Sequence, residues 1–101
     1  MSDSNQQTAR TKQKPIDRVR IGKLNAAIWK VPAPDGSHVY SFTVDRYYKD
    51  EHGNVKNSGS FAFGDALKLG KLADRVDSRI RQLYEIDVHQ AKVDELEKEP
   101  A

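Results

Sequence analysis

The alternation of apolar and polar residues predicts strands in the first half of the chain. In "VYSFTVDRYY", Tyr40, Phe42 and Val44 fall on one face and polar side chains on the other, as in a half-buried antiparallel strand. An earlier alternation changes phase at Gly22, which predicts either a bulge or a corner between two short strands. Two prolines and an Asp-Gly pair predict a loop over residues 31–38.

A hairpin and a long helix follow these strands. "KDEHGN" has turn chemistry, and "VKNSGSFAF" predicts a weaker strand whose Phe61 and Phe63 face the helix as core. From Gly64 or Asp65 onward, apolar residues recur at steps of three and four, which predicts one helix with a single apolar stripe. The expected fold is α+β, with an antiparallel sheet of three to four strands followed by one long C-terminal helix.

Three segments differ in character. Residues 1–16 lack an apolar period and predict a disordered, basic-leaning arm, whereas residues 17–86 form the folded domain. Residues 87–101 form an acidic tail that either extends the helix or is disordered. The charge is asymmetric, because residues 86–101 carry five acidic against two basic side chains while the overall net charge is +2. An anionic partner at the N-terminal end is one reading of this asymmetry, and a mixed solvated surface is the other.

Enzymatic chemistry has little support in the sequence. There is no cysteine, and the three histidines stand alone, so no catalytic residue, metal ligand or cofactor site is predicted. The glycines do not form a phosphate-binding or nucleophile-elbow motif. No apolar run is long enough for a membrane span or a signal peptide, and we expect a protein of the cell interior.

Cations with interspersed aromatic rings point instead to single-stranded nucleic acid. Rings stack on bases of any sequence while lysine and arginine hold the phosphates. The expected contact residues are Arg18, Arg20, Lys23, Trp29, Lys30, Arg46, Tyr48 and Lys56. The alternative is that Trp29 and Tyr48 pack as core or against a partner and that the lysines only solubilise the surface.

"RIGKLNAAIWK", followed by "DRYYKDEHGNVK" and an amphipathic helix, resembles the core of the transcriptional positive cofactor four family of single-stranded-DNA-binding coactivators. The resemblance covers about residues 18–85. It implies a curved antiparallel sheet with a C-terminal helix, a dimer formed through helices, and channels for single-stranded or melted DNA. By position, Lys23 is similar to a lysine that contacts the DNA backbone, Tyr48 to the stacking aromatic, and Lys56 to the lysine of the following strand.

The helix stripe also predicts a homodimer, because it is long enough to cover its own sheet with apolar surface left over. The expected interface residues are Leu69, Leu72, Val76, Ile80 and Leu83. Two functions are carried forward. The first is a non-enzymatic protein that binds single-stranded DNA, or RNA, as a cofactor of transcription, replication or repair, cytoplasmic in a bacterium or nuclear in a eukaryote. The second is a protein-interaction module, such as a mobile-element accessory protein, on the same fold.

Overall fold

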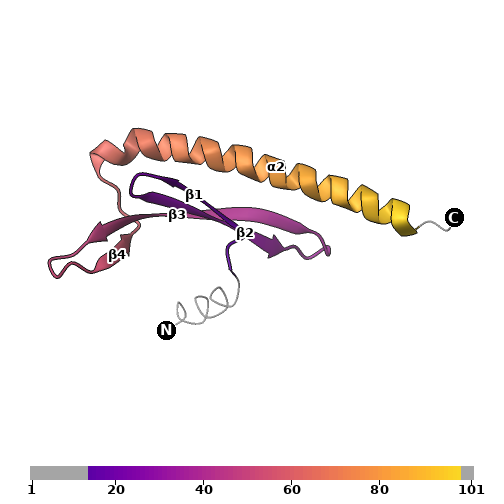
Figure 1. Ribbon diagram of the computed structural model, residues 1–101, viewed down its shortest axis with the longest axis horizontal. Coiled ribbons are helices and arrows are strands. Elements are labelled where there is room, and N and C mark those ends of the chain that lie inside the picture. The colour runs from indigo at the N-terminus through magenta and orange to yellow at the C-terminus, as the bar shows by residue number, and fades with distance from the viewer. Residues whose placement is uncertain (1–13, 99–101) are drawn as a thin grey trace.

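The computed structural model describes residues 14–98, which form one antiparallel sheet and one long helix (Figure 1). The four strands lie in sequence order, each bonded to the next, so the sheet is a simple meander with β1 and β4 at its edges. The elements are β1 (Asp17–Ile21), β2 (Leu24–Pro32), β3 (His38–Lys49), β4 (Val55–Ser58), a short 3₁₀ turn (Phe63–Asp65) and α2 (Ala66–Lys98). The predicted α+β class, strand number and terminal helix are confirmed.

The phase change at Gly22, predicted as a bulge or a corner between two short strands, does separate two strands, but the chain reverses there in a tight hairpin turn. Ile21 pairs with Leu24, so only Gly22 and Lys23 lie between β1 and β2. Gly22 has φ of 59°, while no residue other than glycine has positive φ in the described chain. A glycine with positive φ at the first central position is the pattern of a type II′ turn, whose twist matches that of the flanking strands.

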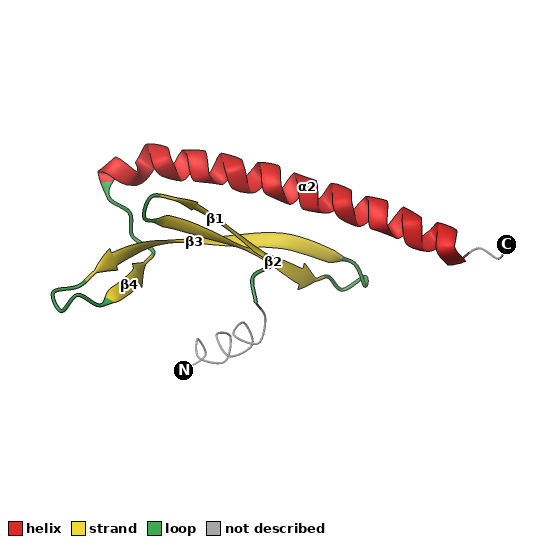
Figure 2. Ribbon diagram, viewed as in Figure 1, coloured by secondary structure: helices red, strands yellow, loops and turns green. Residues whose placement is uncertain are grey.

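The core lies between α2 and the face of β1 and β2 that it covers (Figure 2). Alternate residues of β2 and two residues of α2 are the most deeply buried apolar side chains: Leu24, Ala26, Ile28, Leu72 and Val76, each at most 1% exposed. Val19, Val44, Phe61 and Ile80 are among the partly buried side chains that surround them. At the edge of this core, Arg79 Nε donates to Asp17 Oδ2 at 2.6 Å and joins α2 to β1.

The segment before α2 differs from the prediction in one respect, the exposure of Phe63. Asp65 Oδ2 accepts a hydrogen bond from the Ala62 amide at 2.9 Å, so Asp65 satisfies a backbone donor just before α2, as an acidic residue at this end can. Phe63, expected in the core beside Phe61, is instead 98% exposed. The strand ends at Ser58, and the 3₁₀ turn that begins at Phe63 breaks the two-residue alternation on which that expectation rested.

α2 is longer than the sheet that it covers. It runs for 33 residues, and Asp87 is the last of them with a side-chain bond to the sheet within the described chain. Residues 88–98, which we call the overhang, continue past the strands (Figure 1). The part of the acidic tail that the structure describes is therefore a helical extension. Residues 1–13 and 99–101, which hold most of the predicted N-terminal arm and the end of the tail, lie outside the described residues.

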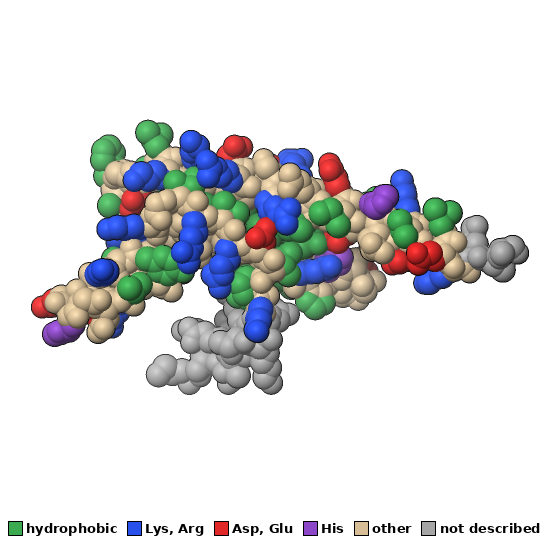
Figure 3. Space-filling model, in the orientation of Figure 1, with side chains coloured by type: hydrophobic (Ala, Val, Ile, Leu, Met, Phe, Trp, Pro, Cys, Tyr) green, Lys and Arg blue, Asp and Glu red, His purple; other side chains and the backbone are tan. Residues whose placement is uncertain are grey.

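Charge divides along α2. Residues 66–81 carry five basic and two acidic side chains, and residues 82–98 carry five acidic and two basic ones. In the space-filling view, Lys and Arg side chains gather over the first half of the helix and acidic ones near its C-terminal end (Figure 3). No helix within residues 14–98 is long and apolar enough to cross a membrane.

Candidate nucleic-acid interface

The strand register places the predicted contact residues on both faces of the sheet. Cross-strand partners share a face, and neighbours along a strand point to opposite faces. Ile28 is buried under α2, and it pairs with Phe42 on β3. The residues on the same face as this pair, an even number of positions away or opposite such a position, are Lys30, Arg46, Tyr48 and Lys56. Arg18, Arg20 and Trp29 lie on the opposite face, and Lys23 is in the β1–β2 turn. The structure therefore does not gather the predicted set into one surface.

On the face away from α2, Arg20 reaches across the sheet to an aromatic ring. Its guanidinium carbon lies 5.4 Å from the centroid of the Tyr47 ring. Its Nε is 3.3 Å from Oδ1 of Asn25, a residue only 3% exposed, and this bond holds the arginine across β2. Further along the same face, Trp29 Nε1 donates to Thr43 Oγ1 at 3.0 Å, which fixes the indole against the sheet.

On the α2 side, Arg46 has the same relation to the next tyrosine. Its guanidinium carbon lies 5.7 Å from the centroid of the Tyr48 ring. Arg46 Nε donates to the Ser60 carbonyl at 3.1 Å and lies 3.6 Å from Asp65 Oδ2, so the guanidinium is held from its inner end. Lys56 is the cross-strand partner of Tyr48 on the same face, and its Nζ lies 3.9 Å from Asp50 Oδ2.

An open hollow of about 550 Å³ lies beside the part of β3 beyond β2, and both tyrosines border it although their rings point to opposite faces of the sheet. It is lined by Lys23, Tyr47, Tyr48, Lys49 and Val55. The hollow forms because β2 begins at Leu24, opposite Arg46, so β3 beyond that point pairs only with β4. We call this two-stranded segment, residues 47–57, the hairpin tip.

Tyr47, Lys49 and Val55 are site residues that sequence reasoning missed. Alternation along β3 puts Tyr47 and Tyr48 on opposite faces of the sheet, so the prediction that chose the face of Tyr48 left out Tyr47. The two-residue turn at Gly22 is the signal that locates these three residues. It fixes the start of β2, and β3 has no β2 partner beyond that point.

Lys30 belongs to a different cluster, at the far end of the sheet. The carboxylate of Asp87 on α2 lies 3.9 Å from Lys30 Nζ and 2.7 Å from His38 Nε2, and it accepts a hydrogen bond from the Tyr40 hydroxyl. These bonds, that of Tyr40 first, hold the pKa of Asp87 below its usual range. Burial and the adjacent Asp87 raise the pKa of Tyr40 to about 12. We call these four residues the clasp, because they join α2 to the ends of β2 and β3.

The predicted dimer-interface residues lie within the protomer itself. Leu72 and Val76 are almost fully buried against the sheet, and Leu69, Ile80 and Leu83 pack against the same core. The apolar surface left over is elsewhere on α2 and at its start. The exposed side chains there are Phe63, Leu67, Tyr84, Ile86, Val88 and Leu96.

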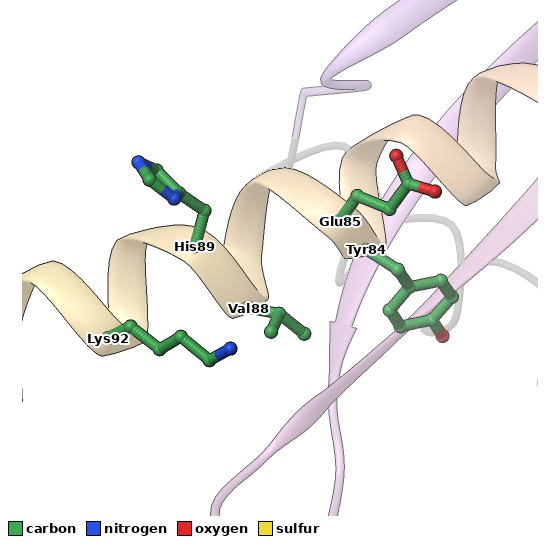
Figure 4. Close-up of a pocket in the computed structure, with 5 residues that line it drawn as sticks. All are labelled: Tyr84, Glu85, Val88, His89 and Lys92. Carbon is green, nitrogen blue, oxygen red and sulfur yellow. The ribbon is translucent and has the colours of Figure 1, made fainter.

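A second hollow, of about 320 Å³, lies on the last third of α2 (Figure 4). Tyr84, Val88 and Lys92 leave the helix on one side, whereas Glu85 and His89 leave it on the other. All five lining residues come from one helix, so no second element encloses the hollow. Residues 14–98 contain no group of three histidine or carboxylate side chains that could hold a metal ion.

Comparison with protein-family models, with curated proteins and with solved structures finds no match to this chain. The candidate site therefore rests on its own geometry.

Proposed function

We propose that this protein binds single-stranded nucleic acid without chemistry of its own and serves transcription, replication or repair. The observation that carries the proposal is the hollow at the hairpin tip, where Tyr47 and Tyr48 lie beside Lys23 and Lys49. Each tyrosine also has an arginine at its ring, at 5.4 Å and 5.7 Å. Rings offer faces to unpaired bases, and the cations offer charge to the phosphates that follow them.

The roles divide by side chain. Tyr48, which is 37% exposed, stacks on a base, and Lys56 opposite it contacts a phosphate. Lys23 contacts the backbone from the β1–β2 turn at the edge of the hollow. Arg20 and Arg46 are each anchored through Nε, which leaves the outer nitrogens of the guanidinium to reach a phosphate. Trp29 and Arg18 extend the surface along the face away from α2.

A titration with a labelled oligonucleotide of about 20 bases, enough for several contacts, tests the proposal. We expect binding that weakens steeply with salt, with a log–log slope near −0.7 for each phosphate contact. A duplex of the same sequence should bind less well, because paired bases hide their faces. A chain that binds neither RNA nor DNA single strands at low salt would refute the proposed function.

The second candidate function is a protein-interaction module. Apolar side chains exposed on and before α2 favour it, above all Phe63 at 98%, Leu67 at 90% and Leu96 at 70%. Phe63 and Leu67 lie at the start of the helix and Leu96 near its end, so they offer two separate apolar sites to a partner. A second copy of the chain is one such partner, and we propose a homodimer in either case. Binding through these residues would depend on salt much less than phosphate binding does, so one salt series separates the two functions.

A further inference from the structure

The hairpin tip has a base-stacking platform on each of its two faces. Tyr47 and Tyr48 are consecutive in β3, so their rings lie on opposite sides of the sheet. Each ring has its own arginine, Arg20 on one face and Arg46 on the other. Cations follow the same division, since Lys56 shares the face of Tyr48 and Lys49 alternates in phase with Tyr47.

Neither face of the tip is covered by other strands or by α2. β2 ends its pairing with β3 at Arg46, and the Tyr47 amide, which donates to the Lys23 carbonyl at 2.9 Å, is the last bond between them. α2 packs on β1 and β2. The hairpin tip consequently projects past the β1–β2 turn as a two-stranded hairpin (Figure 1).

We propose that the hairpin tip inserts between the two strands of a melted duplex and holds one strand on each face. The ligand class is a junction at which paired nucleic acid opens into two unpaired strands. One face stacks a base of the first strand on Tyr48, with Arg46 and Lys56 at its phosphates. The other face stacks a base of the second strand on Tyr47, with Arg20 and Lys49 in the same role.

Separation of the strands follows from the position of the sheet. Bases that stack on opposite faces of a β-sheet have the backbone of β3 and β4 between them and cannot pair with each other. The open form is stabilised because its two strands bind and the paired form offers neither base face. This inference rests on the proposed single-strand binding and adds to it a second binding surface and a branched ligand.

The test compares two labelled DNA substrates with equal duplex length and equal numbers of unpaired nucleotides. One is a fork with two unpaired arms, and the other carries all its unpaired nucleotides on one arm. Total phosphate charge is then the same. Because one more ring engages a base on the fork, we expect it to bind between about fivefold and a hundredfold tighter.

Variants assign the preference to the two faces. Tyr47→Ala should remove the preference for the fork while leaving binding to the one-armed substrate, and Tyr47→Phe, which keeps the ring, should retain it. Arg20→Ala serves as an independent variant of the same face, because it removes the cation and leaves the ring. Ser78→Ala, at an exposed and uncharged site on α2, is the matched control and should leave both affinities unchanged.

The outcomes separate the two proposals. Equal affinity for fork and one-armed substrate, or a fork preference that survives both Tyr47→Ala and Arg20→Ala, overturns the inference and leaves single-strand binding standing. Failure to bind either substrate or any single strand overturns the proposed function and the inference with it.

Discussion

At the scale of single residues, the consecutive tyrosines show how one residue step decides the surface to which a ring belongs. Tyr48 and Lys56 share the α2 side, while Tyr47 faces the other way with Arg20. Two side chains of the same type, adjacent in the sequence, therefore lie on different surfaces of the sheet. The contributions of ring and cation can be measured separately, because stacking does not depend on salt as phosphate contacts do.

Tyr48→Ala is expected to weaken single-strand binding by about 1–3 kcal/mol without changing the salt slope. Lys23→Ala and Lys56→Ala should each reduce the magnitude of that slope by about 0.7, the share of one phosphate contact. Lys92→Ala, at an exposed position of the overhang, is the control with an unchanged slope. Fluorescence titrations at several salt concentrations measure both effects. A Tyr48→Ala protein that binds as tightly as the parent would show that this ring does not stack.

The clasp gives a prediction of pH dependence. Bonds from Tyr40, His38 and Lys30 lower the pKa of Asp87, so its contribution to the free energy of unfolding is complete above about pH 4, the ordinary carboxyl value. It is lost as the pH falls through the lowered pKa. Tyr40 affects stability at high pH, because its pKa is raised to about 12. Its contribution to the free energy of unfolding is lost as the pH rises from about 10 through that value.

Asp87→Asn should therefore lower the free energy of unfolding by about 1–2 kcal/mol at neutral pH, the cost of weakened hydrogen bonds to a charged group. The difference from the parent should shrink toward zero as the pH falls through the lowered pKa of Asp87. Urea denaturation followed by Trp29 fluorescence at each pH gives the measurement. Asp74→Asn, at an exposed carboxylate of the same helix, is the matched control. A constant difference between Asp87→Asn and the parent at all pH values would contradict a role for the carboxylate charge.

At the scale of elements, α2 uses one stripe of its surface for the sheet and leaves other apolar side chains in solvent. Leu72→Ala should destabilise the protomer by about 2–5 kcal/mol, because it leaves a cavity at a position with no exposed area. Leu67→Ala, at 90% exposed, should change the free energy of unfolding by no more than about 0.5 kcal/mol. Denaturant titrations on dilute samples compare the two leucines directly. A similar loss at both would mean that Leu67 is covered in solution.

At the scale of the whole molecule, the division of charge along α2 favours an antiparallel pairing with a second copy. Such a pairing sets the basic first half of one helix beside the acidic second half of the other. It would also cover the overhang, which continues past the strands, and helices in water depend on packing for most of their stability. A charged substitution at Val76 cannot test this interface. The Val76 side chain is only 1% exposed, so a charge there would unfold the protomer itself.

The double variant Val88→Ser, Leu96→Ser tests the dimer, since both residues lie on the overhang and are 57% and 70% exposed. We expect the parent to sediment as a dimer at micromolar concentration and the variant as a monomer with an intact sheet by circular dichroism. Salt should weaken the parent dimer because opposite charges contribute to it, but less steeply than it weakens phosphate binding. A parent chain that sediments as a monomer, or a variant that remains a dimer, would rule out this arrangement.

The sequence by itself determined the elements of this protein. Alternation located β3, the phase change at Gly22 located a break in the strand pattern without predicting a hairpin, and steps of three and four predicted α2. These periods follow from the geometry of one strand or one helix. The alternation failed at Phe63, where a 3₁₀ turn intervenes. Only the tertiary structure decided which residues meet. The register of β2 against β3 placed the predicted cations on two faces and brought Tyr47 to the hollow, since pairing between strands distant in sequence depends on long-range contacts that no local period records.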